Sequence, residues 1–140
     1  MKLIALPILA TTLFAGCLRT PSYQASCCRP PQGETAASVS TISAEQAYRM
    51  MSESTDLVVL DVRTEQEFRE RRIEGALLIP HDEIRVRAKN MLPNKNQTIL
   101  VYCRTGRRSA IAAGELVGLG YVNVYDFGGI TTWPYDTVGD

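Results

Sequence analysis

Residues 98–110 of this chain read TILVYCRTGRRSA, a run of strand-forming side chains that passes through one cysteine into a cluster of cations. The first five residues, TILVY, are those of a buried strand. Arg104, Arg107 and Arg108 follow Cys103 within the next five residues, and their mutual repulsion predicts that something negative belongs among them. The stretch therefore predicts a strand, an anion-binding turn and then a helix.

Length and composition predict one globular domain. The chain has 140 residues, of which 45% are hydrophobic and 21% charged, and this length is too short for two domains of ordinary size. The formal net charge is zero, which excludes an overall basic field suited to nucleic acid. We therefore expect no nucleic-acid partner, and we expect the arginines to recognise a small anion locally.

The first 16 residues, MKLIALPILATTLFAG, predict an export signal that is not part of the fold. Lys2 supplies a positive start, and the apolar stretch of residues 3–15 is too short to span a bilayer comfortably. Pro7 and the missing amphipathic period argue against a core helix here. We therefore expect residues 1–16 to be a signal peptide and the product to be exported.

Residues 13–17, LFAGC, resemble the lipobox of bacterial lipoproteins, with Phe14 where that family usually has leucine. The resemblance implies that Cys17 is lipidated, becomes the first mature residue and anchors the chain to a membrane. In the same resemblance, Leu18 after the cysteine favours the outer membrane, facing the periplasm. Without lipidation the product would be a soluble periplasmic protein.

The four cysteines predict neither a disulfide framework nor a metal site. Cys17 belongs to the signal, Cys27 and Cys28 are adjacent, and Cys103 stands alone. Adjacent cysteines rarely bridge each other without strain, and no two pairs have the spacing of a zinc site, so we expect no metal. In an oxidising compartment Cys27 or Cys28 could pair with another chain or bind copper; solvated thiols are the favoured interpretation.

Residues 17–39 predict a flexible tether. Between residues 18 and 38 there are three prolines, small polar residues and almost no large apolar side chains. Such a segment cannot bury enough apolar surface to offset the entropy lost on ordering. The folded domain is therefore expected to occupy residues 40–140.

Strand and helix signals alternate beyond residue 39. Capping boxes at Ser43 and Thr64 predict two helix starts. The other predicted helices span residues 82–92 and about 107–119, and the predicted strands span residues 57–62, 76–79, 98–102 and 122–125. This alternation predicts an α/β fold with a mostly parallel central sheet and helices on both faces.

A few side chains have an expected place in that fold. Phe68 is predicted to point inward, and Leu119 is placed on the inner face of the last helix together with Ala112 and Leu116. Gly118 or Gly120 is expected to cap that helix. Asp61 and Arg63 are expected to form a structural ion pair or to fix loops near the site, with a direct chemical role disfavoured. Trp133 is expected to pack the C-terminal segment onto the domain.

Cys103 is the predicted nucleophile because it sits where a parallel strand ends and a helix begins, the usual ligand position in such sheets. The helix N-terminus, an amide nest through Thr105 and Gly106, and the arginines would all lower the pKa of its thiol. A buried structural cysteine is disfavoured, since a core would exclude so many donors and cations. His81 could face the site, but a solvated or capping role is favoured, so a Cys–His pair of the papain kind is not expected.

Five motifs resemble, in order and spacing, the single-domain rhodanese family. They are Asp61-Val62-Arg63 with Glu67-Phe68, Ile73-Glu74-Gly75-Ala76 with Ile79-Pro80, the segment Cys103-Arg104-Thr105-Gly106-Arg107-Arg108-Ser109, Gly120-Tyr121-Val122-Asn123-Val124, and Gly128-Gly129 before Trp133. The resemblance covers roughly residues 40–136. Arg72 stands where the family often has histidine. A three-layer rhodanese-like domain is the fold that this resemblance implies.

The resemblance implies sulfur transfer from a small anionic donor such as thiosulfate to cyanide or a thiol. Cys103 would take the outer sulfur of the donor and become a persulfide, with no metal or organic cofactor. Arg108, with Arg104 or Arg107, would hold the oxyanion of the donor, and the backbone amides would cradle the sulfur. The implied substrate-binding residues are Arg104, Thr105, Gly106, Arg107, Arg108 and Ser109.

Loop length discriminates between related chemistries. Six residues run from Cys103 to Arg108 inclusive, whereas related phosphatases and arsenate reductases use seven, and the smaller ring fits a single sulfur atom. A cysteine-dependent phosphatase or arsenate reductase is one alternative, and a non-enzymatic persulfide carrier or docking module is another. The sequence indicates neither the physiological donor and acceptor nor the oligomeric state.

Overall fold

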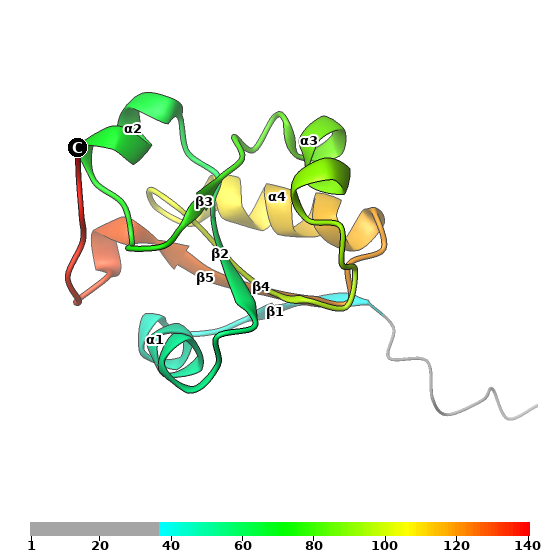
Figure 1. The fold of residues 1–140 in the computed structure, drawn as a ribbon, viewed down its shortest axis with the longest axis horizontal. Helices are drawn as coiled ribbons and strands as arrows, with labels where there is room; N and C mark the ends of the chain where they lie inside the picture. Colours follow the sequence, from blue (N-terminus) through cyan, green and yellow to red (C-terminus); the bar gives the residue numbers. More distant parts are fainter. Residues whose placement is uncertain (1–36) are drawn as a thin grey trace, which may run out of the picture. The chain divides into compact units, whose positions relative to one another are not determined.

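A five-stranded parallel sheet forms the centre of the domain (Figure 1). The structure is a computed structural model that describes residues 37–140. In the order β1-β5-β4-β2-β3, every pair of neighbouring strands is parallel. The strands are β1 (Ser38–Thr41), β2 (Leu57–Asp61), β3 (Leu77–Leu78), β4 (Thr98–Cys103) and β5 (Asn123–Gly129).

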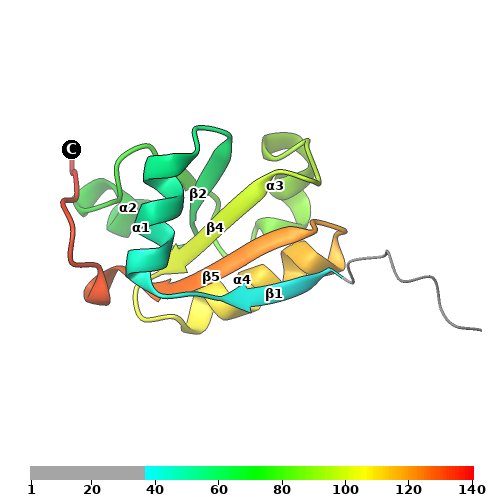
Figure 2. The ribbon, with the colours of Figure 1, turned by 90° about the horizontal axis from the view of Figure 1, so that it is seen from below.

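Helices cover both faces of this sheet, as Figures 1 and 2 show. One face carries α1, and the other carries α3 and α4. The helices are α1 (Ala44–Glu53), α2 (Glu65–Glu70), α3 (Ile84–Met91) and α4 (Arg107–Gly118), with a 3₁₀ turn, η1 (Ile130–Thr132), after β5. The predicted α/β class, with a parallel sheet between helical layers, is confirmed.

Strand β4 decides which side chains face which layer. Ile99, Val101 and Cys103 pack with α3 and α4, whereas Leu100 and Tyr102 pack with α1 and the C-terminal segment. All five are buried. This alternation follows from the two-residue period of a strand, and it places the side chain of Cys103 on the α4 side of the sheet.

Both predicted capping boxes are present. Ser43 exchanges hydrogen bonds with Gln46 at the start of α1, and Thr64 does the same with Glu67 at the start of α2. At the other end of α4, Gly120 has a φ of +89°, as expected of a glycine that follows a helix. The capping residues were predictable because they act within one helical turn.

Two side-chain predictions need correction. Leu119 is 37% exposed, because α4 ends at Gly118 and its backbone leaves the helical path before the inner face is reached again. Phe68 is only half-buried, and the Arg72 guanidinium lies 4.9 Å from its ring centroid. A cation–π contact with Arg72 thus takes the place of part of the core contact expected for this ring.

The sequence missed one strand and shortened another. Strand β1 begins at Ser38, inside the segment predicted as tether; all four of its side chains are exposed, so it lacks the apolar pattern of a strand and is held by pairing with β5. Strand β5 runs to Gly129 instead of ending at residue 125. The prediction stopped too early because Asp126 and the two glycines have low strand propensity.

The predicted signal peptide (residues 1–16), Cys17, Cys27, Cys28 and the tether up to residue 36 lie outside the described residues. Within residues 37–140, no helix is both long and apolar enough to span a bilayer.

Candidate active site

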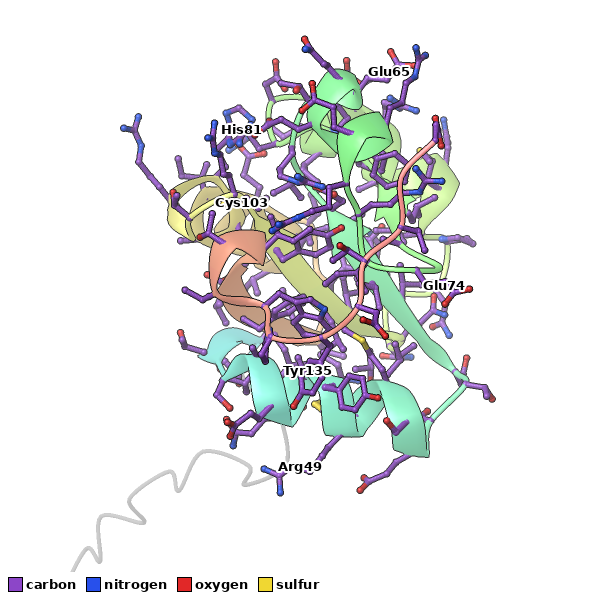
Figure 3. All side chains as sticks on the ribbon, turned by 90° about the vertical axis from the view of Figure 1, so that its left-hand side faces the viewer. Arg49, Glu65, Glu74, His81, Cys103 and Tyr135 are labelled. Atoms are coloured by element: carbon purple, nitrogen blue, oxygen red, sulfur yellow. The ribbon has the colours of Figure 1, made fainter. Side chains whose placement is uncertain are left out.

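Cys103 is the last residue of β4 and is 1% exposed. A tight turn follows, and α4 begins at Arg107. Gly106 makes this turn possible, because its φ is +103°, a conformation that strains any residue with a Cβ. Figure 3 shows Cys103 at the end of β4, well separated in that view from Arg49 and Tyr135.

Backbone donors surround the Cys103 thiol. The Gly106 amide donates a hydrogen bond to its Sγ at 3.1 Å. Burial raises the pKa of Cys103, but hydrogen bonds from Ser109, Gly106 and Thr105 outweigh this effect, so the pKa lies below its ordinary value of 9.0. Because these donors favour the charged form, the site presents a nucleophile at lower pH than free cysteine does.

Ser109 joins the cysteine loop to β5. Its hydroxyl donates to the carbonyl oxygen of Gly106 at 2.9 Å and lies 3.3 Å from that of Gly128. The residue is fully buried, as a polar side chain can be when it is hydrogen-bonded. Ser109 therefore fixes the first turn of α4 beneath the thiol.

Arg108 is held by Glu67 of α2. Its two terminal nitrogens lie 2.7 and 2.8 Å from the two carboxylate oxygens, the bidentate geometry that makes such pairs strong. The hydrogen bond from Arg108 lowers the pKa of Glu67 to about 2. Arg108 thus remains charged beside the thiol, but one edge of its guanidinium is already occupied.

Glu67 is the site residue that sequence reasoning missed. The sequence showed Glu67 as the N3 residue of a capping box and as part of the first family-like motif, but gave it no role in the site; its carboxylate does accept from the Thr64 amide at 3.1 Å. The contact with Arg108 spans 41 positions of sequence, so local pattern could not indicate it.

Arg104 and Arg107 have exposed side chains. Within residues 37–140, neither side chain takes part in an ion pair. The backbone of Arg104 is fixed nonetheless, since its carbonyl oxygen accepts from the amide and the hydroxyl of Thr131, at 3.3 and 3.0 Å. The turn therefore presents two exposed cations on a hydrogen-bonded backbone.

Gly129 allows the cysteine loop to pack directly against β5. A Cβ at this position would lie 2.7 Å from the Cα of Thr105 and closer still to the Arg104 carbonyl. A register shift between Val101 and Cys103 places one extra residue of β5 here, as in a β-bulge. The Gly128-Gly129 motif therefore serves the site by close approach of two backbones.

The ion pair predicted between Asp61 and Arg63 supports the same edge of the sheet. Its closest atoms are 2.6 Å apart, and the two side chains are 0% and 4% exposed. Arg63 also donates to the carbonyl oxygen of Arg71, whose own guanidinium donates to that of Ile130 at 2.7 Å. The pair thus connects β2 to the segment after α2, and its structural role is confirmed.

His81 has no contact with the thiol among the described hydrogen bonds. Its Nδ1 lies 3.7 Å from Asp82, and the side chain is 36% exposed. In residues 37–140 there is also no cluster of three metal-ligating side chains. The arrangement is that of a thiol in a turn of backbone donors flanked by arginines, which favours the thiolate form.

A parallel α/β sheet with a cysteine of lowered pKa at the head of a six-residue turn defines a class of thiol-containing domains. Residues 43–134 match the Rhodanese family, described as a rhodanese-like domain. The chain therefore belongs to the rhodanese family.

Curated relatives and solved structures agree with this assignment. The chain is 37% identical over 71 residues to thiosulfate sulfurtransferase PspE of Escherichia coli K12, covering 51% of this chain and 68% of that protein. It is 31% identical over 96 residues to a sulfurtransferase of Allochromatium vinosum, covering 68% and 88%. These relatives place the chain in a sulfurtransferase family.

Two solved structures share the fold. A rhodanese with anions from E. coli is 32% identical with a TM-score of 0.56, covering 59% of this chain and 98% of that one. A rhodanese-related protein from Thermoplasma volcanium is also 32% identical, with a TM-score of 0.63 and coverage of 72% and 99%.

Proposed function

We propose that this protein is a thiosulfate sulfurtransferase that carries sulfur as a persulfide on Cys103. The observation that carries the proposal is the Cys103 thiol, whose pKa is lowered by donors of its own turn and whose Sγ accepts from the Gly106 amide at 3.1 Å. The thiosulfate sulfurtransferase named among the relatives supports the choice of donor.

In the first half-reaction, the Cys103 thiolate attacks the outer sulfur of thiosulfate. A sulfur–sulfur bond forms to Cys103, the bond within the donor breaks, and sulfite leaves with the electron pair. Because sulfite is a stable leaving group, no general acid is required. The persulfide retains the negative charge, which the amides of the turn stabilise.

In the second half-reaction, cyanide or a thiolate attacks the terminal sulfur of the persulfide. The bond to Cys103 breaks, and its electrons return to the Cys103 thiolate. Thiocyanate or a new persulfide is released, so no external oxidant or reductant takes part. The sequence of steps is ping-pong, with free sulfurated enzyme between the two halves.

The arginines divide the electrostatic work. Arg104 and Arg107, whose side chains are exposed, meet the sulfonate of the donor at the rim. Arg108 stays fixed by Glu67 and supplies positive charge beside the thiol. The positive charge of these arginines favours an anionic donor. A small donor such as thiosulfate needs no large preformed pocket.

Intact mass after incubation with thiosulfate tests the proposal. We expect the mass of one added sulfur atom, its removal by cyanide with release of thiocyanate, and no addition to Cys103→Ser. Sulfur added equally to Cys103→Ser would contradict the assigned nucleophile. Turnover of an aryl phosphate or arsenate, with no sulfur taken from thiosulfate, would support the oxyanion enzymes instead. Persulfide formation on Cys103 without any turnover would support a non-enzymatic persulfide carrier.

We also propose that the chain is exported and anchored through Cys17. The support is the hydrophobic segment of residues 3–15 and the lipobox-like LFAGC. Radiolabelled palmitate should enter the protein and should not enter Cys17→Ala. Equal labelling of both proteins, or of neither, would reject the anchor.

A further inference from the structure

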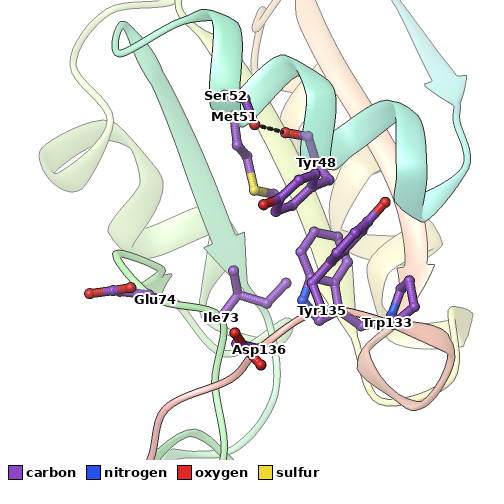
Figure 4. A pocket seen from close by; sticks show the side chains of 9 residues that line it. Tyr48, Met51, Ser52, Ile73, Glu74, Trp133, Tyr135 and Asp136 are labelled. Carbon is purple, nitrogen blue, oxygen red and sulfur yellow. Dashed lines mark hydrogen bonds between the residues drawn. The ribbon is translucent and has the colours of Figure 1, made fainter.

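A second pocket lies away from the cysteine turn, between α1, the loop after α2 and the C-terminal segment (Figure 4). Its volume is about 540 Å³, within the range of small-ligand sites. Its lining residues Ile73 and Trp133 belong to the core on the α1 side of the sheet, whereas Cys103 packs on the α4 side. Sulfur transfer at Cys103 makes no use of this pocket.

Aromatic rings form one wall of the pocket. Tyr48 and Tyr135 are stacked, with centroids 3.8 Å apart and an interplanar angle of 14°. Trp133 meets both edge-on, at 6.1 and 5.1 Å. The faces of such rings carry negative quadrupole density and attract cations.

Two acidic residues also line the pocket, and Figure 4 shows the Glu74 side chain directed away from the aromatic rings. Glu74 and Asp136 line the pocket, and no lysine, arginine or histidine does. Both are exposed, and neither takes part in an ion pair within residues 37–140. Arg49, next to Tyr48 on α1, points outward in Figure 3. The pocket is therefore acidic as well as aromatic.

Trp133 adds an independent indication of a missing ligand group. The residue is 9% exposed, and its Nε1 is buried with no hydrogen-bond partner in the described part of the chain. A buried indole N–H normally has an acceptor. Figure 4 shows the indole behind the Tyr135 ring, at the pocket wall. An oxygen acceptor on a ligand would satisfy it.

We propose that this pocket binds an arginine residue of a peptide. The planar guanidinium lies against the outer face of the stacked tyrosine pair and pairs with Asp136 and, after a change of rotamer, with Glu74, while a neighbouring amide carbonyl accepts from Trp133 Nε1. Arginine fits better than lysine because its flat cation both stacks on rings and bonds carboxylates through a fork of donors. Because Trp133 Nε1 is buried and the indole lies behind the Tyr135 ring, this ring must shift to admit the carbonyl.

Fluorescence of Trp133 tests the proposal directly, because the chain contains a single tryptophan. Nα-acetyl-arginine amide is the probe, and Nα-acetyl-citrulline amide is its uncharged analogue of nearly the same shape. We expect a saturable change in emission with the arginine probe and at least about tenfold weaker binding of citrulline, which lacks the charge. Equal binding of both probes, or no saturable change with either, would overturn the proposal.

Matched variants locate the binding. The double substitution Glu74→Gln with Asp136→Asn should weaken arginine binding at least about tenfold, a loss typical of removing charge partners. Glu65→Gln with Asp56→Asn changes the same number of exposed carboxylates outside the pocket and should leave binding unchanged. Full affinity in the first pair would contradict the site. Cys103→Ser should bind the probe normally, so the result is independent of sulfur transfer.

Discussion

Two arginine–carboxylate pairs stand near the carboxyl end of the sheet and differ in burial. In the Asp61–Arg63 pair, the side chains are 0% and 4% exposed; in the Glu67–Arg108 pair, they are 21% and 24% exposed. Both are close, charge-assisted contacts. Their burial indicates different roles. A fully buried pair is costly to break and therefore contributes to stability, whereas a half-buried pair keeps part of its arginine accessible to solvent.

The buried pair is part of the architecture. Burial would lower the pKa of Arg63, but the hydrogen bonds and charge of Asp61 raise it, so Arg63 stays charged in the core. Arg63 also lies 5.6 Å from the Tyr102 ring centroid. The partly exposed pair, by contrast, sets the charge beside Cys103, whose own charge contributes to the raised pKa of Arg108.

Breaking the buried pair should have the largest effect on stability. Arg63→Ala leaves Asp61 buried without its cation, which costs about 3–5 kcal/mol of unfolding free energy. Chemical denaturation measures this loss. Arg69→Ala, which removes an exposed partner of Glu65, is the matched control and should cost less than about 1 kcal/mol. Similar losses of unfolding free energy in both variants would show that burial of the Asp61–Arg63 pair does not make it more important for stability than an exposed pair.

Crowding the loop should have the next largest effect. A Cβ from Gly129→Ala meets the backbone of the cysteine turn, and overpacking of this kind costs about 1–3 kcal/mol. Sulfur loading of Cys103 should fall with it, because the turn must shift. The control is Gly114→Ala, since a Cβ there meets nothing within 4 Å and alanine favours the helix by up to about 1 kcal/mol. A stable, active Gly129→Ala would show that the close approach is not required.

Glu67→Gln should have a smaller effect on stability, about 1–2 kcal/mol at neutral pH. The pKa of Glu67 falls from 4.5 to about 2 on folding, so this stabilisation is fully present above about pH 4.5 and is lost as pH falls toward 2. The difference in unfolding free energy between wild type and variant should therefore shrink on acidification. A difference that stays constant with pH would mean that the carboxylate charge is not its source.

The same variant distinguishes a positioning role from a structural one. Removing the Glu67 charge leaves Arg108 less neutralised, so the Cys103 pKa should fall further and iodoacetamide alkylation should begin at lower pH. In the wild type, the inflection should already lie below 9.0, the ordinary value for the thiol. An alkylation profile that Glu67→Gln does not move would restrict this pair to a structural role.

Removing an exposed cation should change stability least. Arg104→Ala and Arg107→Ala remove side chains with no ion pair among residues 37–140, so we expect changes within about 0.5 kcal/mol. The KM for thiosulfate should rise in the double variant, with little change in kcat, because ground-state binding is lost. An unchanged KM would mean that Arg108, and not Arg104 or Arg107, binds the oxyanion of the donor.

The sequence predicted most of the fold because its signals are local. Both capping boxes act within one turn of helix, and the apolar runs at β2 and β4 have the length of buried strands. Strand β1 was not predicted, because the side chains of this edge strand are exposed and show no apolar pattern. Leu119 was misplaced because helix length depends on where the chain turns, which periodicity alone does not specify.

For the site, the sequence by itself determined the candidate nucleophile Cys103, the glycine of the turn and the group of cations, since all lie within residues 103–109. Tertiary structure decided which cation has an acidic partner among residues 37–140: Arg108 is paired with Glu67 across 41 positions, whereas Arg104 and Arg107 take part in no ion pair there. It also decided that Gly129 touches the turn and that Tyr48 stacks on Tyr135. The physical reason is range, because a turn or cap is fixed by neighbours along the chain, whereas ion pairing and close packing depend on which distant segments the fold brings into contact.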